Sequence, residues 1–92
     1  MSHCKPEQLS DVEIVLDEIK KFDLIKEKKK GVFYLKSKAF LHFHVKENKR
    51  WADARCGKSW GEPIILPFNP SEVSIKKFLK TVKQYYLKTS AT

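Results

Sequence analysis

The spacing of apolar residues changes twice along this chain, from helical to alternating and back to helical. The first helical stretch predicts a one-sided helix over residues 10–21, with Ser10 as its cap. The alternating stretch predicts a sheet over residues 32–67, in which short connections force neighbouring strands to be antiparallel. The last stretch predicts a second one-sided helix over residues 70–88, capped by Asn69.

These elements predict an α+β two-layer sandwich: a helix, a four-stranded antiparallel meander and a helix, with both helices on one sheet face. A length of 92 residues leaves room for one hydrophobic core, so we expect a single domain over residues 1–92. Residues 1–8 and 89–92 lie outside the apolar repeats and are expected to be flexible. The lysine-rich run 26–31 and the polar cluster 47–50 should be solvated connections. A functional site is therefore best sought on the uncovered sheet face.

The charge of the chain is strongly positive, at +8 with a pI near 9.6, and is unevenly placed. Residues 1–27 carry four lysines and seven acidic residues, whereas the remainder carries fifteen basic and four acidic residues. A protein with this excess of positive charge attracts polyanions. However, seventeen of the nineteen basic residues are lysine, and base reading and bidentate phosphate binding favour arginine. The charge therefore does not separate a nucleic-acid partner from an acidic protein partner or from simple solubility.

Other bulk features indicate the compartment. No apolar run approaches the roughly 20 residues that span a bilayer, and the polar start does not resemble a secretion signal. Cys4 and Cys56 are too few and too far apart in sequence for a disulfide framework or a zinc pair, so we expect free thiols. We therefore expect a cytoplasmic protein with no membrane span.

Two histidines that lie two residues apart are the sharpest chemical feature of the sequence. Side chains alternate along the predicted strand 39–46, where Leu41 and Phe43 suit the face under the helices. The next predicted strand, 51–56, places small residues on that same face. The side chains that we expect on the open face are therefore Phe40, His42, His44, Lys46, Trp51, Asp53 and Arg55.

The aromatic and basic residues of this face favour a non-catalytic binding module. Flat rings at Phe40, His42, His44 and Trp51 offer stacking platforms, and Lys46 and Arg55 offer phosphate contacts, as in sheets that bind single-stranded nucleic acid. An acidic protein partner would suit the same charges. The interpretation requires no cofactor.

A second interpretation is a metal site or a small enzyme site. His42, His44 and Asp53 share the open face, and zinc accepts imidazole nitrogen and carboxylate oxygen as ligands. The ordinary alternative is a pair of half-exposed histidines bonded to Asp53 across the strands. A third interpretation is a homodimer that buries Phe40 and Trp51 against a second copy of the chain.

The block GVFYLKSKAFLHFHVKENKRWADAR, residues 31–55, resembles a family of small bacterial proteins without an assigned activity. In that family an aromatic strand, a basic turn and an F-L-H-F-H strand precede a strand with an aromatic-Ala-Asp core. The resemblance covers roughly a quarter of the chain. It implies a bacterial cytosolic origin and assigns no site residue, cofactor or partner.

Overall fold

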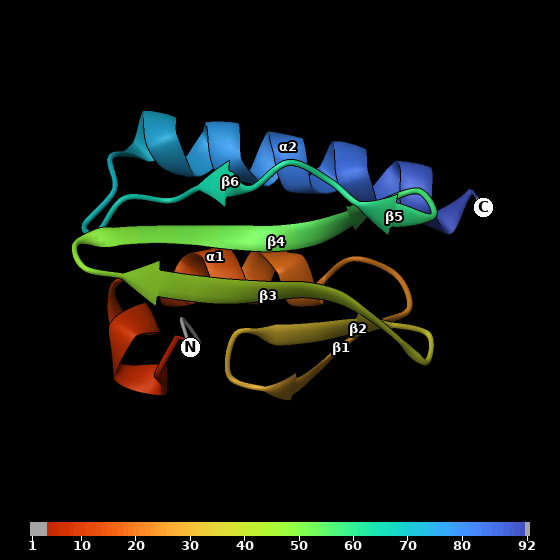
Figure 1. Ribbon diagram of the computed structural model, residues 1–92, viewed down its shortest axis with the longest axis horizontal. Helices are drawn as coiled ribbons and strands as arrows, with labels where there is room; N and C mark the ends of the chain where they lie inside the picture. Colours follow the sequence, from red (N-terminus) through yellow and green to blue (C-terminus); the bar gives the residue numbers. More distant parts are fainter. Residues whose placement is uncertain (1–3, 92) are drawn as a thin grey trace.

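The structure is a computed structural model that describes residues 4–91, and it combines helices with one antiparallel sheet (Figure 1). The strands follow the order β1-β2-β3-β4-β5, and β6 also pairs with β4. The predicted α+β class and antiparallel sheet are confirmed, but the sheet has six strands rather than four. In chain order the elements are a 3-10 helix Pro6–Val12, α1 Glu13–Lys20, β1 Ile25–Lys29, β2 Val32–Leu35, β3 Lys38–Lys46, β4 Lys49–Cys56, β5 Ser59–Trp60, β6 Ile64–Ile65 and α2 Glu72–Ser90.

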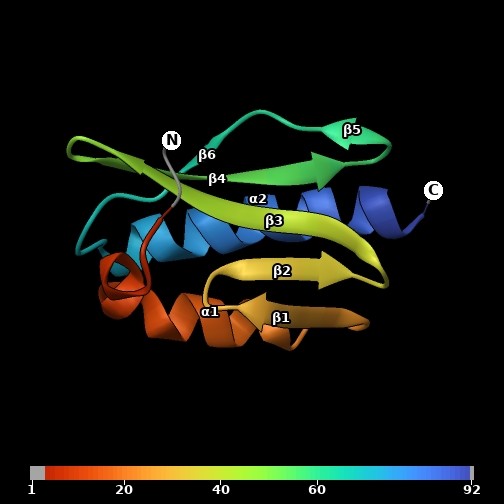
Figure 2. The same cartoon turned by 60° about the horizontal axis from the view of Figure 1, so that its bottom comes forward.

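One layer of the molecule is the sheet and the other contains the two α-helices. Figure 2 shows α1 and α2 behind the strands, with α2 running alongside β4 and α1 behind β1. The core lies between the layers, because buried residues of α1, α2 and the sheet form a single apolar cluster. Its central members are Val15, Leu16, Ile19, Phe33, Leu41, Phe43, Ala52, Ala54, Phe78 and Val82. The opposite face of the sheet carries the half-exposed side chains discussed below.

The prediction of a solvated connection over residues 26–31 is wrong, because most of this run is strand β1. Ile25 pairs with Leu35 of β2, and both side chains are buried. Gly31 lies in the turn to β2 with a φ of +80°, a conformation that glycine adopts without steric cost. The lysines of β1 suit an edge strand, whose charged side chains discourage pairing with other molecules.

The N-terminal prediction also needs correction. Residues 1–3 lie outside the described part of the chain, but Pro6–Val12 form a 3-10 helix in place of the expected flexible segment. Leu9 of this helix is fully buried. Ser10 does not cap α1: it lies inside the 3-10 helix, where its hydroxyl donates to the carbonyl of Glu7. α1 is therefore shorter than the predicted helix over residues 10–21.

The second helix begins two residues later than predicted. Ser71 rather than Asn69 is its cap, and the Ser71 hydroxyl accepts a hydrogen bond from the amide of Ser74 at 3.1 Å. α2 extends to Ser90, so part of the predicted flexible tail 89–92 is helical, and residue 92 lies outside the described part of the chain. Within residues 4–91, neither helix has an apolar stretch long enough to cross a bilayer.

A β-bulge in β3 places the side chain of Phe40, a predicted site residue, on the side of the sheet opposite to the one predicted. Tyr34 pairs with Ala39, while the adjacent Phe33 pairs with Leu41, so Phe40 is an extra residue on β3. A bulge of this kind interrupts the alternation of side chains. Phe40 is consequently buried with Leu41 on the helix side, where its ring meets Tyr86 of α2 edge-on at 6.2 Å between centroids.

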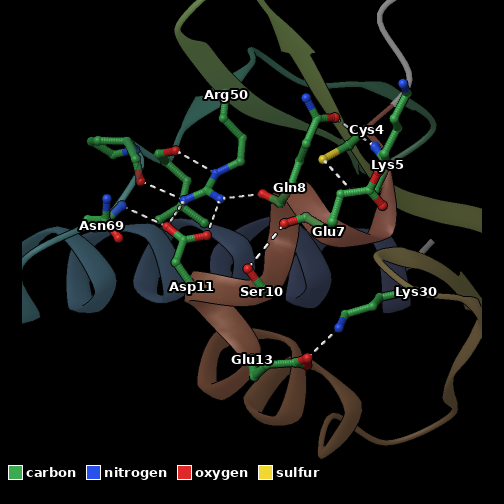
Figure 3. Close-up of polar contacts among 12 residues, drawn as sticks. Cys4, Lys5, Glu7, Gln8, Ser10, Asp11, Glu13, Lys30, Arg50 and Asn69 are labelled. Atoms are coloured by element: carbon green, nitrogen blue, oxygen red, sulfur yellow. Dashed lines mark hydrogen bonds and ion pairs between the residues drawn. The ribbon is translucent and has the colours of Figure 1, made fainter.

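Arg50, predicted to lie in a solvated loop, is buried in β4 and is 1% exposed. Its guanidinium forms a bidentate pair with Asp11, with Nη1 2.6 Å from Oδ1 and Nη2 3.0 Å from Oδ2. It also donates to three backbone carbonyls, those of Gln8, Leu66 and Pro67 (Figure 3). One side chain thus holds together the 3-10 helix, β4 and the segment that leads into α2.

Candidate metal centre on the open sheet face

The register of β3 and β4 brings three potential metal ligands together. His42 lies directly opposite Asp53, and His44 lies opposite Trp51. His44 is two residues from His42 and Asp53 is two residues from Trp51, so all four side chains share one face. This is the face away from the helices, because Phe43, Ala52 and Ala54 alternate with them and are buried.

The side-chain atoms of this cluster converge on one carboxylate oxygen. Oδ2 of Asp53 lies 2.9 Å from Nε2 of His44 and 3.8 Å from Nε2 of His42. The two imidazole rings meet edge-on with their centroids 4.5 Å apart. The side chains are 27% exposed at His42, 13% at His44 and 30% at Asp53, so the cluster is held by the sheet yet open to water.

The spacing of these atoms matches what a small divalent ion requires. One ligand atom from each of His42, His44 and Asp53 lies within 4.8 Å of the other two. Ligands at about 2.0–2.2 Å from a tetrahedral zinc ion lie roughly 3.4 Å from one another, between the two distances to Asp53. Small side-chain rotations would therefore seat an ion. Its fourth position would face solvent.

Two tryptophans border the cluster. The ring of Trp51 stacks on His44 with centroids 5.5 Å apart, and the ring of Trp60 meets His42 edge-on at 5.1 Å. The aromatic contacts restrict both imidazoles. The set of open-face residues predicted from the sequence does not include Trp60. The signal was the turn Gly57-Lys58, since two residues that begin with glycine are typical of a tight hairpin, and Cys56 pairs with Ser59 across it.

The other predicted ligand-binding residues are not part of this cluster. Phe40 is buried beneath α2 and is unavailable for stacking. Lys46 is exposed at the end of β3, next to the turn into β4. The guanidinium of Arg55 lies over the ring of Trp60 at 4.7 Å, and its Nε donates to the carbonyl of Ala39 at 2.7 Å. The open face therefore offers fewer free rings than the sequence predicts.

The two cysteines do not extend the cluster. Both thiols are free. Burial raises the pKa of the Cys4 thiol, and the nearby positive charge of Arg50 opposes this only in part, so the reactive thiolate is disfavoured. Cys56 is half-buried at the end of β4.

Comparisons of the chain with protein-family models, with curated proteins and with solved structures find no match. The resemblance of residues 31–55 to small bacterial proteins therefore remains a prediction. Function is therefore inferred from the geometry of the site.

Proposed function

We propose that this protein binds one divalent transition-metal ion, most naturally zinc, on its open sheet face. The ligands are Nε2 of His42, Nε2 of His44 and Oδ2 of Asp53, and water completes the coordination. The observation that carries the proposal is the approach of Asp53 Oδ2 to both imidazole nitrogens, at 2.9 and 3.8 Å. Imidazole and carboxylate ligands suit zinc, copper and nickel, whereas calcium and magnesium prefer oxygen alone.

The placement of the ligands supports binding more than it supports catalysis. Three protein ligands with an open fourth position is the arrangement that catalytic zinc sites use. However, two cavities among the described residues, of about 400 and 280 Å³, have neither His42 nor His44 in their lining, whereas substrate sites are concave. We therefore propose a metal-binding function and assign no reaction.

Nucleic-acid binding by the same face is the second candidate. It is supported by Trp60, which is 42% exposed, and by the positive charge of Arg55 beside it. The burial of Phe40 and the stacking of Trp51 on His44 reduce the ring surface left for bases. These contacts favour the metal site over the stacking surface.

The decisive experiment is zinc titration of the purified protein by calorimetry, with metal analysis after dialysis. We expect one equivalent to bind the parent protein, and His44→Ala to weaken binding by at least about tenfold, because one of three protein ligands is lost. Lys46→Ala is the control on the same strand, since Lys46 is exposed at the end of β3 and is not a member of the cluster. Binding should also weaken as the pH falls, because protons compete for imidazole.

Binding of cobalt in place of zinc shows whether the metal ligands are the residues of this cluster or the cysteine thiolates. We expect a cobalt spectrum without thiolate charge-transfer bands, unchanged in the Cys4→Ser variant. The proposal is rejected if His42→Ala and His44→Ala bind zinc as tightly as the parent protein. It is also rejected if a single-stranded oligonucleotide binds through Trp60 while no stoichiometric metal does.

A further inference from the structure

A basic cavity lies at the other end of the β3–β4 hairpin from Lys46 and contains neither histidine of the metal cluster. Its volume is about 400 Å³, and the turns after β2 and β4 and the end of α2 enclose it. This volume lies within the range of small-molecule sites. Its charged and hydroxyl-bearing lining residues include Lys36, Ser37, Lys38, Arg55, Lys58 and Ser90.

The positive charge of this cavity is not neutralised by the protein. Four cationic side chains line it, and no acidic residue does. Among residues 4–91, none of these four cations forms an ion pair, whereas Lys20, Lys21, Lys30 and Arg50 all pair with carboxylates. The concentration of unpaired positive charge in one concave site creates a potential that attracts anions.

Hydrogen bonds fix the walls of the cavity. The hydroxyl of Thr89, in the last turn of α2, donates to the carbonyl of Arg55 at 2.8 Å and accepts from the amide of Gly57 at 3.0 Å. Arg55 in turn donates through Nε to Ala39 of β3 at 2.7 Å. These contacts connect α2, β3 and β4 around the cavity, so its shape is established before a ligand arrives.

The cavity also has an apolar side. Leu35 and Ala39 line it, and Ala39 is half-buried while Leu35 is 6% exposed. A ligand that joins an anionic group to a small apolar or aromatic group would meet both sides.

We propose that this cavity binds a small molecule that carries a phosphate group next to an apolar group. The cavity and the proposed metal site have no residue in common. The C-terminal end of α2 opposes anion binding, but its partial charge is about half of one elementary charge, compared with four formal positive charges in the lining. The lysines therefore determine the sign of the potential.

The experiment is a titration of the parent protein with phenyl phosphate, followed by the amide signals of Ser37, Gly57 and Lys58 in ¹⁵N–¹H spectra. We expect saturable shifts at these amides, and weaker binding of inorganic phosphate, which lacks the apolar group. The shifts should diminish with added salt, which screens accessible charges. His44→Ala should bind phenyl phosphate within about twofold of the parent protein, because it lacks contact with the cavity.

Two double variants test whether the cavity rather than the total charge determines binding. Lys38→Gln with Lys58→Gln removes two exposed cations of the lining and should weaken phenyl phosphate binding by at least about tenfold. Lys76→Gln with Lys80→Gln removes the same charge from exposed positions on α2 outside the lining and should have an effect below about twofold.

Three results would overturn the proposal. The first is equal weakening in both double variants, which would indicate general attraction to a basic protein. The second is the absence of saturable shifts at the cavity amides in the parent protein. The third is tight binding of a single-stranded oligonucleotide that shifts open-face signals and leaves the cavity signals unchanged, which would assign the positive charge to a nucleic-acid partner.

Discussion

Replacing Arg50 with methionine is the sharpest test of how this fold is held together. The substitution keeps an unbranched apolar stem and removes the guanidinium, which forms five hydrogen bonds. Three of the acceptors are backbone carbonyls, which would lose their hydrogen-bond donor. Arg50 is only 1% exposed, so its position is closed to solvent. The bidentate pair with Asp11 would also be lost.

The expected loss of stability follows from the burial of the two partners. Removing one partner of a buried ion pair costs about 3–5 kcal/mol. Asp11 retains 20% of its side-chain exposure, so water can solvate the carboxylate left behind, and we expect the lower end of this range, about 3 kcal/mol. A domain of this size has a free energy of unfolding of roughly 5–14 kcal/mol. The variant should therefore fold, but with a large fraction of its stability lost.

Urea denaturation followed by circular dichroism measures this loss. Arg55→Met is the matched control, since Arg55 lies on the same strand, is half-exposed and has a side chain that forms one hydrogen bond among the described residues. We expect the control to lose no more than about 1 kcal/mol. If Arg50→Met loses no more than the control, Arg50 does not join these segments as inferred from its contacts.

Three further predictions concern other parts of the fold. Hydrogen bonds from Arg50 lower the pKa of Asp11 below its usual value of 3.8. The stability that the ionised Asp11 contributes is therefore complete above pH 3.8, and it is lost as the pH falls through the lowered pKa. Asp11→Asn should therefore show a shallower acid-side decline in urea denaturation than the parent protein, and equal declines would contradict this. Phe40→Ala should lose about 3–5 kcal/mol, as expected of a core aromatic, whereas a loss below about 1 kcal/mol would place its ring on the surface. Gly31→Ala should lower the thermal midpoint, because a Cβ at its φ of +80° would lie 2.4 Å from Cδ1 of Leu9; an unchanged midpoint would disprove that packing.

The central hairpin was predictable from the sequence because its signals are local. Alternation from Leu41 to Lys46 assigns the faces of β3, but the predicted connection 47–50 is two residues too long, because Lys46 pairs with Lys49 of β4. The shared face of His42, His44 and Asp53 still follows from the alternation, because a shift of the pairing by two residues leaves the facing of side chains unchanged. This part of the candidate site therefore required no information about distant segments of the chain.

The residues that sequence reasoning misplaced depend on contacts between distant segments. Ala39, Phe40 and Leu41 are three consecutive apolar residues, so the sequence does not indicate where the alternation is interrupted. Only packing against Tyr86 of α2 selects Phe40 as the extra residue. Arg50 is similar, since it becomes buried only when Asp11, 39 residues earlier, supplies a carboxylate. An isolated arginine near a turn gives no sign of that partner.

The short strand β5 connects the two proposed sites. The ring of Trp60 contacts two side chains: its centroid lies 5.1 Å from that of His42 in the metal cluster and 4.7 Å from Cζ of Arg55, which lines the cavity. A divalent cation bound at the proposed cluster and an anion bound in the proposed cavity would attract each other. Each ligand should therefore favour the binding of the other, and linkage requires the two effects to be equal in free energy. The contact of Trp60 with both groups gives a physical reason for an exposed tryptophan on a two-residue strand.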